Sequence, residues 1–124
     1  MIEVVAGIIY KDNKFLIAQR NFKKSQGGLW EFPGGKVEKN ETYEVSLIRE
    51  IKEEFDAEIQ VTEYVGENIH HYPDKDIKLI FYKAKLLSED IKLLEHENYK
   101  WITKDESTNF KFSPADNAIF EFDI

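Results

Sequence analysis

The densest chemical pattern in the sequence is a pair of glycines followed by three closely spaced glutamates. These residues are Gly34, Gly35, Glu50, Glu53 and Glu54. A helix turns about 100° per residue, so the three carboxylates would share one face within an arc of roughly 100°. Carboxylates about 4 Å apart repel by roughly 4 kcal/mol at an effective dielectric constant near 20, and the dipole of a helix disfavours anions near its C-terminal end. A divalent cation such as Mg²⁺, which prefers oxygen ligands, would offset this cost.

Glutamates at helical spacing also occur on solvated outer faces of helices, and this is the alternative to a metal site. The expected helix runs from the N-cap Thr42 to Phe55, and Val45, Ile48, Ile51 and Phe55 recur at the spacing of a buried stripe. The acids would therefore project from a packed, rigid element. The preceding glycines lack a Cβ and let a backbone group approach a ligand closely. Together these features favour a metal site over a solvated face.

Alternation of apolar and polar residues predicts the elements that position this helix. We expect strands at residues 4–10, 15–19, 30–32, 58–71, 77–87 and 99–102, with turns at 11–14 and 73–76 and a polar loop at 21–28. A second helix would run from Pro114, in the first helical position, to Phe120. Strands interleaved with two helices favour an α+β fold with a mixed β-sheet between the helices.

Composition bounds the class of protein. With 124 residues, 42% of them hydrophobic and 14% aromatic, the chain suits one globular domain over residues 1–124. The absence of cysteine excludes disulfides and thiol catalysis. A net charge of −7 argues against binding nucleic acid polymers. The short N-terminal apolar run contains Glu3 and has no basic leader, so we expect no signal peptide, no membrane partner and a cytoplasmic location. As a separate expectation, the protein is a monomer or a homodimer.

Gly35, Glu41 and the run Arg-Glu-Ile-Lys-Glu-Glu from Arg49 to Glu54 stand at the spacing of the Nudix box. The chain thus resembles the Nudix hydrolases, which act on nucleoside diphosphates linked to another group. The resemblance implies an α/β/α sandwich with a mixed sheet. One departure is that Asp56 stands where the family usually has glycine. Aspartate tolerates the left-handed turn that ends such a helix, so we expect a modest stability cost and no loss of chemistry.

The resemblance also implies roles for the acids. Glu50, Glu53 and Glu54 would hold Mg²⁺, with Mn²⁺ as an alternative, and the Gly34 carbonyl would be a further ligand. Arg49 would orient these carboxylates together with Glu41, a kind of contact that supports metal affinity. The general base would be a box glutamate or Glu95, which is also a candidate metal ligand. Its alternative is an ordinary acid in a polar loop. We assign no catalytic role to His70, His71 or His96, and adjacent histidines on a strand point to opposite faces.

Further segments, at residues 5–9, 18–20, 29–38 and 113–116, resemble the MutT-type nucleoside triphosphate pyrophosphohydrolases. This implies that water cleaves a nucleoside triphosphate into the monophosphate and pyrophosphate. The leading expectation is removal of oxidised nucleotides such as 8-oxo-dGTP. The alternative is hydrolysis of CTP, dCTP or 5-substituted cytosine nucleotides. A catalytically silent nucleotide-binding module is disfavoured because every box glutamate is present.

The same resemblance suggests residues that contact a nucleotide. Arg20, with Lys36 beside the glycines, would hold phosphate, and this role is favoured over the alternative that Arg20 is a surface cation. Phe32 and Tyr72 would lie near the base, where aromatic faces stack well, and their alternative is the core. Lys75 stands where the oxidised-guanine enzymes have arginine.

Asp116 is the most discriminating of the expected substrate contacts. By resemblance it occupies the place where an asparagine reads the base edge in the bacterial oxidised-guanine enzyme. An ionised aspartate only accepts hydrogen bonds, which suits an exocyclic amine, whereas a protonated aspartate also donates and permits an oxo-purine. Its alternative is an acid favoured by the dipole at a helix N-terminus.

Overall fold

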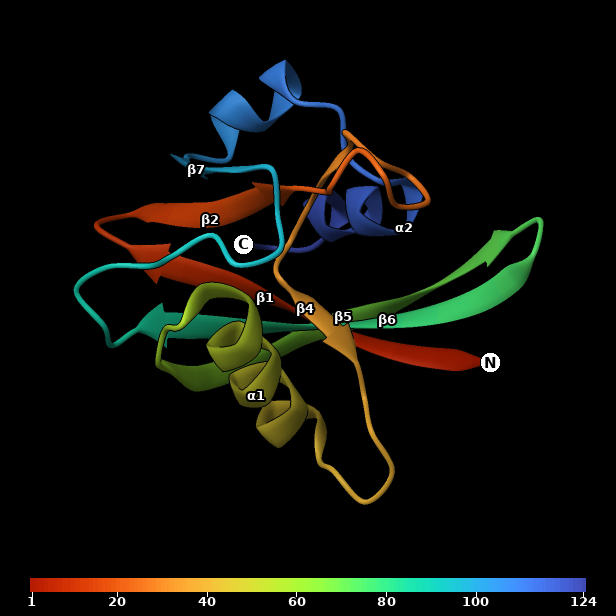
Figure 1. The fold of residues 1–124 in the computed structure, drawn as a ribbon, viewed down its shortest axis with the longest axis horizontal. Coiled ribbons are helices and arrows are strands. Elements are labelled where there is room, and N and C mark those ends of the chain that lie inside the picture. Colours follow the sequence, from red (N-terminus) through yellow and green to blue (C-terminus); the bar gives the residue numbers. More distant parts are fainter.

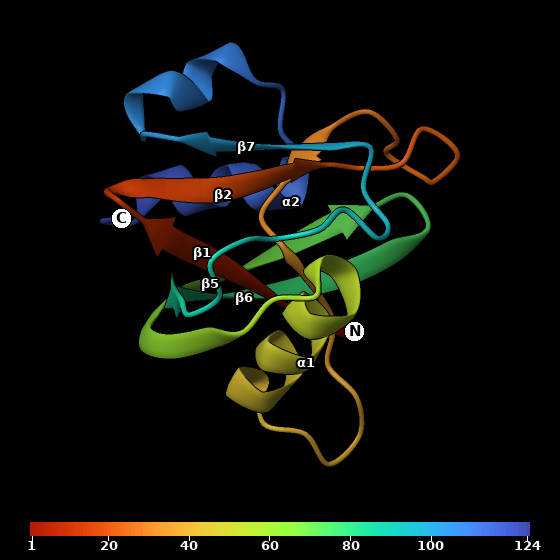
Figure 2. The ribbon, with the colours of Figure 1, turned by 60° about the vertical axis from the view of Figure 1, so that its left-hand side comes forward.

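The computed structural model describes residues 1–124 and contains a mixed β-sheet with helices on both faces (Figures 1 and 2). The elements are β1 (Ile2–Lys11), β2 (Lys14–Gln19), β3 (Trp30–Glu31), β4 (Gly34–Lys36), α1 (Tyr43–Phe55), β5 (Ile59–Tyr72), β6 (Lys75–Leu86), β7 (Asn98–Ile102), η1 (Asp105–Asn109), α2 (Pro114–Asn117) and η2 (Ala118–Glu121). The expected α+β architecture is confirmed. None of these helices is long and apolar enough to cross a membrane.

Strand β1 is the centre of the sheet. It pairs in parallel with β6 from Ile2↔Ile77 to Tyr10↔Lys85, and β6 pairs with β5 in antiparallel fashion. The β5–β6 turn is tighter than expected, because Tyr72 still pairs with Lys75. The hairpin expected between β1 and β2 is confirmed. Its two-residue turn, Asp12–Asn13, has positive φ at both positions, as a turn that follows the right-handed twist of the strands requires.

Strands β1 and β2 separate soon after this turn. Strand β2 goes on to pair with β3 and β7, whereas β1 pairs with β4 through Ala6↔Gly34. The chain crosses the opening between them at Phe32 and Pro33, where the Gly7 N–H donates to the Pro33 carbonyl at 2.8 Å. A Cβ on Gly34 would overlap the Val5 carbonyl, so this crossing requires a glycine. The opening places β3, β4 and the end of β2 around one cleft.

Helix α1 begins and ends as the sequence predicts. The Thr42 side chain accepts a hydrogen bond from the Val45 N–H at 3.1 Å, which caps the first turn. At the other end Asp56 adopts the left-handed conformation, with φ 50° and ψ 43°, and its N–H donates to the Lys52 carbonyl. The aspartate therefore takes the backbone role of the usual glycine.

The buried face of α1 differs from the predicted stripe. Val45 is 52% exposed and Ile48 is 37% exposed, whereas Leu47, Ile51 and Phe55 are buried. The prediction is confirmed for Ile51 and Phe55 and wrong for Val45 and Ile48, because the helix carries apolar residues on two sides and their spacing does not show which side meets the sheet. On an ideal helix, the true face lies about 60° from Glu54, about 100° from Glu50 and about 160° from Glu53. These different angles from the buried face of α1 explain why Glu50, Glu53 and Glu54 differ in burial.

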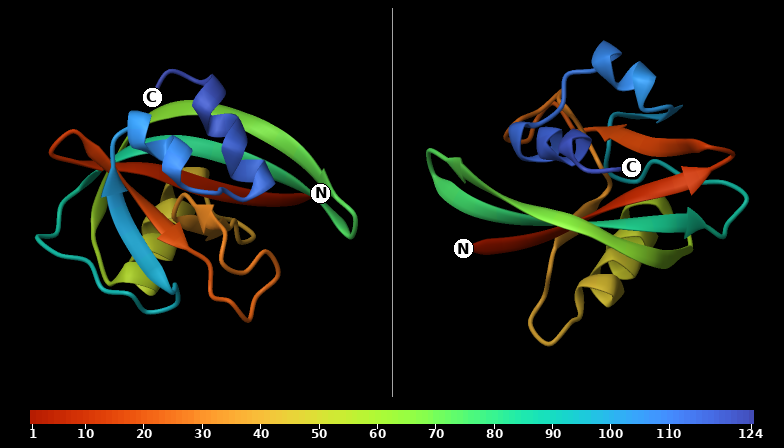
Figure 3. Two further views of the ribbon diagram at one scale, coloured as in Figure 1. Left: turned by 90° about the horizontal axis from the view of Figure 1, so that it is seen from above. Right: turned by 180° about the vertical axis from the view of Figure 1, so that it is seen from behind.

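The two faces of the sheet carry separate cores. Alternate residues of β1 point to opposite sides, so Val5 and Ile9 pack with α1 while Ala6 and Ile8 pack with the C-terminal helices. Figure 3 shows α1 on one face and α2 with η2 on the other. The second helix has Pro114 at its start as expected, and it continues as the 3₁₀ helix η2.

Candidate active site

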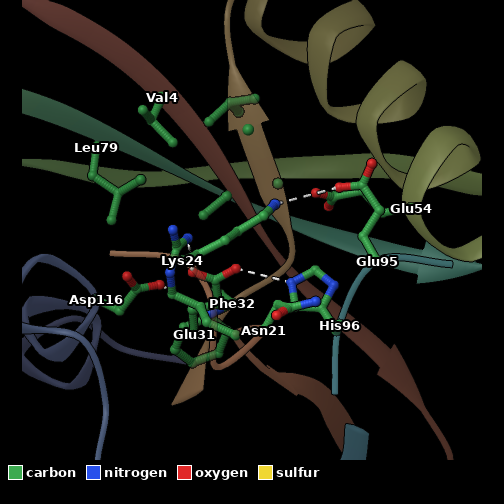
Figure 4. Close-up of a pocket in the computed structure, with 15 residues that line it drawn as sticks. Val4, Asn21, Lys24, Glu31, Phe32, Glu54, Leu79, Glu95, His96 and Asp116 are labelled. Atoms are coloured by element: carbon green, nitrogen blue, oxygen red, sulfur yellow. Dashed lines mark hydrogen bonds and ion pairs between the residues drawn. The ribbon is translucent and has the colours of Figure 1, made fainter. Parts of the chain in front are cut away.

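A cleft with two connected parts lies in the opening between β1 and β2. The acidic part, about 170 Å³, is lined by Asn21, Lys24, Gly34, Glu54, Glu95 and His96, among others (Figure 4). The hairpin part, about 250 Å³, is lined by Lys36, Tyr72, Lys75 and Ser113, among others. Arg20, Glu31, Gly35 and Asp116 line both parts. The cleft therefore joins a carboxylate-rich end to a more open polar pocket.

Glu54 is the acid whose surroundings are least like a solvated helix face. Its Oε1 atom is buried and has no hydrogen-bond partner. Burial, followed by repulsion from Glu50, Glu31 and Glu95, raises the pKa of its carboxyl to about 9. A buried carboxylate oxygen that has no donor and is repelled by three further carboxylates is a group whose charge a hard cation would stabilise. The solvated alternative still describes Glu53, whose side chain is 56% exposed.

Arg49 forms hydrogen bonds with the other carboxylates of the Nudix box, those of Glu41, Glu50 and Glu53. Its guanidinium donates to Glu41 at 2.7 and 2.9 Å, to Glu50 at 2.9 Å and to Glu53 at 3.3 Å. The Arg49 hydrogen bonds lower the pKa of Glu41 to about 2. For Glu50 burial outweighs the bond from Arg49, and its pKa is raised. No three acidic or histidine side chains converge as ligands on one point in this arrangement, and Arg49 engages both Glu50 and Glu53.

Glu95 lies beside the box because backbone hydrogen bonds fasten its segment to the end of α1. The Lys92 N–H donates to the Phe55 carbonyl at 2.8 Å, and the Leu94 N–H donates to the Glu54 carbonyl at 3.1 Å. The Lys24 side chain reaches across the cleft, with Nζ 3.8 Å from Glu95 Oε2 (Figure 4). Glu95 is thus held at the acidic part of the cleft. Lys24, from the loop after β2, has no expected role in the sequence.

The two glycines leave room for different neighbours. The nearest atoms to a Cβ on Gly35 would be those of the Glu50 carboxylate, whereas a Cβ on Gly34 would overlap the backbone of β1. We expect Gly35→Ala to fold normally but to displace the Glu50 carboxylate, lowering kcat/KM by about 10- to 100-fold. Gly34→Ala should instead lower the free energy of unfolding by about 2 kcal/mol or more. Urea unfolding and steady-state kinetics of both variants test this pair. Full activity in Gly35→Ala would contradict the assigned packing.

Arg20 lines both parts of the cleft, and its guanidinium already forms an ion pair and a hydrogen bond within the protein. Its Nη1 pairs with Glu31 Oε1 at 2.9 Å, and its Nε donates to the Ser25 carbonyl at 3.0 Å. Lys36 and Lys75 line the hairpin part. Tyr72 also lines it, and the Tyr72 hydroxyl accepts a hydrogen bond from the Ala115 N–H at 3.2 Å. These four residues therefore line one pocket, although Arg20 and Lys36 are distant in sequence from Tyr72 and Lys75.

Asp116 and Phe32 are in direct contact at the floor of the cleft. The Phe32 N–H donates to Asp116 Oδ1 at 2.9 Å. Burial, followed by repulsion from Glu31, raises the pKa of Asp116 well above its ordinary value. The Phe32 ring is only 3% exposed and packs against Phe15, Phe112 and Phe120. A stacking role for the Phe32 ring is therefore not supported, and its backbone instead orients Asp116.

Besides Lys24, the sequence predicts no role for two further residues of the cleft, Glu31 and His96. Glu31 accepts from Arg20 with one oxygen and contacts His96 Nε2 with the other at 2.9 Å. His96 packs flat against Phe55, with 5.2 Å between ring centroids. The one available signal was Glu31 itself, a charged residue between two aromatic residues in a short strand. His96 gave no signal, because its partners are distant in the chain.

Comparison with known proteins identifies the family of this chain. Residues 4–122 match the family model of the NUDIX domain. The chain is 38% identical over 121 residues to the CTP pyrophosphohydrolase of Escherichia coli K12, covering 98% of this chain and 90% of that protein. It is also 38% identical over 121 residues to the 8-oxo-dGTP diphosphatase of Buchnera aphidicola subsp. Schizaphis graminum, covering 98% and 91%. The solution structure of MutT from methicillin-resistant Staphylococcus aureus 252 is 43% identical, with a TM-score of 0.75 and coverage of 97% and 95%.

The fold and these matches define the class of protein as a hydrolase. The chain belongs to the Nudix hydrolase family, which confirms the resemblance seen in the glycine and glutamate pattern. Nudix hydrolases generally use divalent metal ions, in keeping with the unpartnered oxygen of Glu54.

Proposed function

We propose that this protein hydrolyses nucleoside triphosphates to the monophosphate and pyrophosphate, with oxidised purine nucleotides such as 8-oxo-dGTP as its leading substrates. The observation that carries the proposal is the cleft itself. Its acidic part contains Glu54 with a buried, unpartnered oxygen, and its hairpin part contains Asp116 at the floor. A cation-dependent site for the triphosphate would explain the acidic part of the cleft, and a pocket for the base would explain the hairpin part.

Glu50, Glu53 and Glu54 are the proposed holders of Mg²⁺, with the Gly34 carbonyl and Glu95 as further candidates. When bound, such an ion polarises phosphoryl oxygens, neutralises their charge and helps to activate water. Arg49 keeps Glu50 and Glu53 oriented through its hydrogen bonds. Glu95 is the proposed general base outside the box, since its segment is fastened to the backbone of α1 beside Glu54.

The nucleotide would lie along the cleft with its phosphates towards the acidic part. Arg20 borders both parts and would contact the phosphates, and Lys36 would add a second cation. Tyr72 and Lys75 border the pocket proposed for the base. Burial raises the pKa of Asp116 and so favours the protonated form of its carboxyl. It could then both donate to and accept from a base edge, which suits an oxo-purine.

Cytosine nucleotides are the second candidate substrates. They are favoured by the similarity to a CTP pyrophosphohydrolase and by the aspartate itself, since an ionised Asp116 would only accept hydrogen bonds from an exocyclic amine. The two candidates therefore differ in the protonation state that Asp116 needs when the base is bound.

A substrate panel separates these candidates. We expect kcat/KM for 8-oxo-dGTP to exceed that for dCTP, CTP and 5-methyl-dCTP by at least about tenfold with Mg²⁺, and pyrophosphate release to stop when EDTA is added. Asp116→Asn keeps both a donor and an acceptor, so the preference for 8-oxo-dGTP should persist at every pH. Preference of the unaltered enzyme for cytosine nucleotides, lost in Asp116→Asn, would establish the second candidate instead.

A further inference from the structure

We propose that His96 is a positioning residue that acts through Glu31 to hold Arg20 in place for the phosphates of the nucleotide. The proposal rests on the proposed function and adds a residue for which the sequence predicts no role. Its basis is a continuous chain of contacts. His96 Nε2 lies 2.9 Å from Glu31 Oε2, and Glu31 Oε1 lies 2.9 Å from Arg20 Nη1. Glu31 is thus held at both carboxylate oxygens.

The His96 end of this chain is rigidly placed. The His96 side chain is only 6% exposed, and its ring lies flat on Phe55 of α1, with an angle of 13° between the rings. The backbone next to it is fastened on both sides, since Leu94 bonds to Glu54 and Glu97 bonds to Gln19. The His96 ring therefore fixes the position of Glu31 relative to α1, the helix that carries Glu50, Glu53 and Glu54.

The chemistry of the His96 ring also favours a role in positioning. A carboxylate oxygen accepts hydrogen bonds, so Nε2 donates to Glu31. The other ring nitrogen, Nδ1, is buried and has no partner. A buried nitrogen without a partner costs stability, and an apolar ring of similar shape would avoid that cost. What the imidazole adds over such a ring is its bond to Glu31.

At the Arg20 end of this series of contacts, one nitrogen of the guanidinium, Nη2, remains available to a ligand. Arg20 uses Nη1 for Glu31 and Nε for the Ser25 carbonyl, and no side chain or carbonyl of the protein engages Nη2. Arg20 borders both parts of the cleft. Without His96, the Oε2 atom of Glu31 loses its partner, and the Glu31 side chain is free to rotate. Arg20 would then lose its alignment with the phosphates.

The test compares two replacements of His96 with a matched control. His96→Phe keeps a flat ring against Phe55 and removes only the contact with Glu31, and His96→Gln keeps a donor near the position of Nε2. For His96→Phe we expect KM to rise about tenfold, the effect of losing one charge-assisted hydrogen bond, with kcat within about twofold. His96→Gln should restore much of KM. His71→Phe, an exposed histidine on the β5–β6 hairpin, should leave both constants unchanged.

Two further measurements make the outcome decisive. Mn²⁺ binding without nucleotide should be the same in His96→Phe and the unaltered protein, and the thermal midpoint should not fall. In Arg20→Gln, adding His96→Phe should have no further effect on KM. An unchanged KM in His96→Phe, additive effects of the two changes, or weaker Mn²⁺ binding would overturn the proposal. If the unaltered protein neither cleaves triphosphates nor binds their imido analogues, the proposed function itself fails, and this inference fails with it.

Discussion

Replacing Glu54 with glutamine is expected to abolish Mg²⁺-dependent turnover while leaving the fold intact. Glu54 is the acid of α1 with a buried oxygen that lacks a partner, so a neutral amide removes the anionic charge on which cation binding there depends. We expect kcat to fall on the order of 10³-fold, which corresponds to losing about 4 kcal/mol of transition-state stabilisation. Pyrophosphate release at saturating Mg²⁺ measures the effect. Glu58→Gln, an exposed acid paired with Lys52, is the control and should retain full activity.

The stability of the same variant gives a second, independent readout. Glu54 has a folded-state pKa of about 9 against an ordinary value of 4.5. Its protonated form therefore favours the folded state fully below about pH 4.5, and that contribution is lost as the pH rises towards about 9. In EDTA, the thermal midpoint of the unaltered protein should fall from pH 5 to pH 9, and Glu54→Gln should flatten this dependence. A variant with the same pH dependence, or with near-normal turnover, would refute the assignment of Glu54.

Replacing Arg49 with glutamine should instead damage both stability and metal binding. Arg49 donates to Glu41, Glu50 and Glu53, and its removal leaves the partly buried Glu50 without its compensating charge. We expect the free energy of unfolding in EDTA to fall by about 2 to 3 kcal/mol. The dissociation constant for Mg²⁺ should rise about 10- to 100-fold, because Glu50 and Glu53 are no longer oriented. Urea unfolding and calorimetric titration with Mg²⁺ measure these two quantities.

Lys52→Gln is the matched control for Arg49. Lys52 lies on the same helix and forms ion pairs with Asp56 and Glu58, but these side chains are largely exposed to water. Its replacement should change the free energy of unfolding by less than about 1 kcal/mol and leave Mg²⁺ binding unaltered. Arg49→Lys should not rescue Arg49→Gln, since one ammonium group cannot reproduce a fork of bonds to several carboxylates. Equal stability of Arg49→Gln and Lys52→Gln would contradict the role given to Arg49.

Features set by short-range spacing could be predicted from the sequence. The β1–β2 turn, the Thr42 cap and the left-handed Asp56 each depend on a few adjacent residues. The glycine pair and the glutamates also follow one another closely, so the family resemblance was visible and placed Arg49 correctly among them. The α+β architecture followed from the order of strands and helices.

Features set by packing between distant segments could not be predicted. The orientation of α1 on the sheet decided that Leu47, rather than Val45 and Ile48, is buried, and helical spacing alone fits both sides. The contact between Glu31 and His96 joins residues 65 positions apart, and neither residue belongs to the Nudix box. The Phe32 ring was expected to lie near the nucleotide base. It is instead buried in the core, and only the Phe32 backbone N–H contacts a cleft residue, Asp116.

The separation of β1 from β2 has a consequence for how the enzyme acquires activity during folding. The turn at Asp12–Asn13 closes between neighbouring residues, whereas β1 can join β6 only by bringing Ile2 to Ile77 across most of the chain. Local contacts form early, and pairings between distant segments impose the slower, entropically costly step. Glu31 and His96, which are 65 positions apart, likewise come into contact only when distant segments have packed together. Catalytic competence should therefore emerge late in refolding, well after the first hairpin has formed.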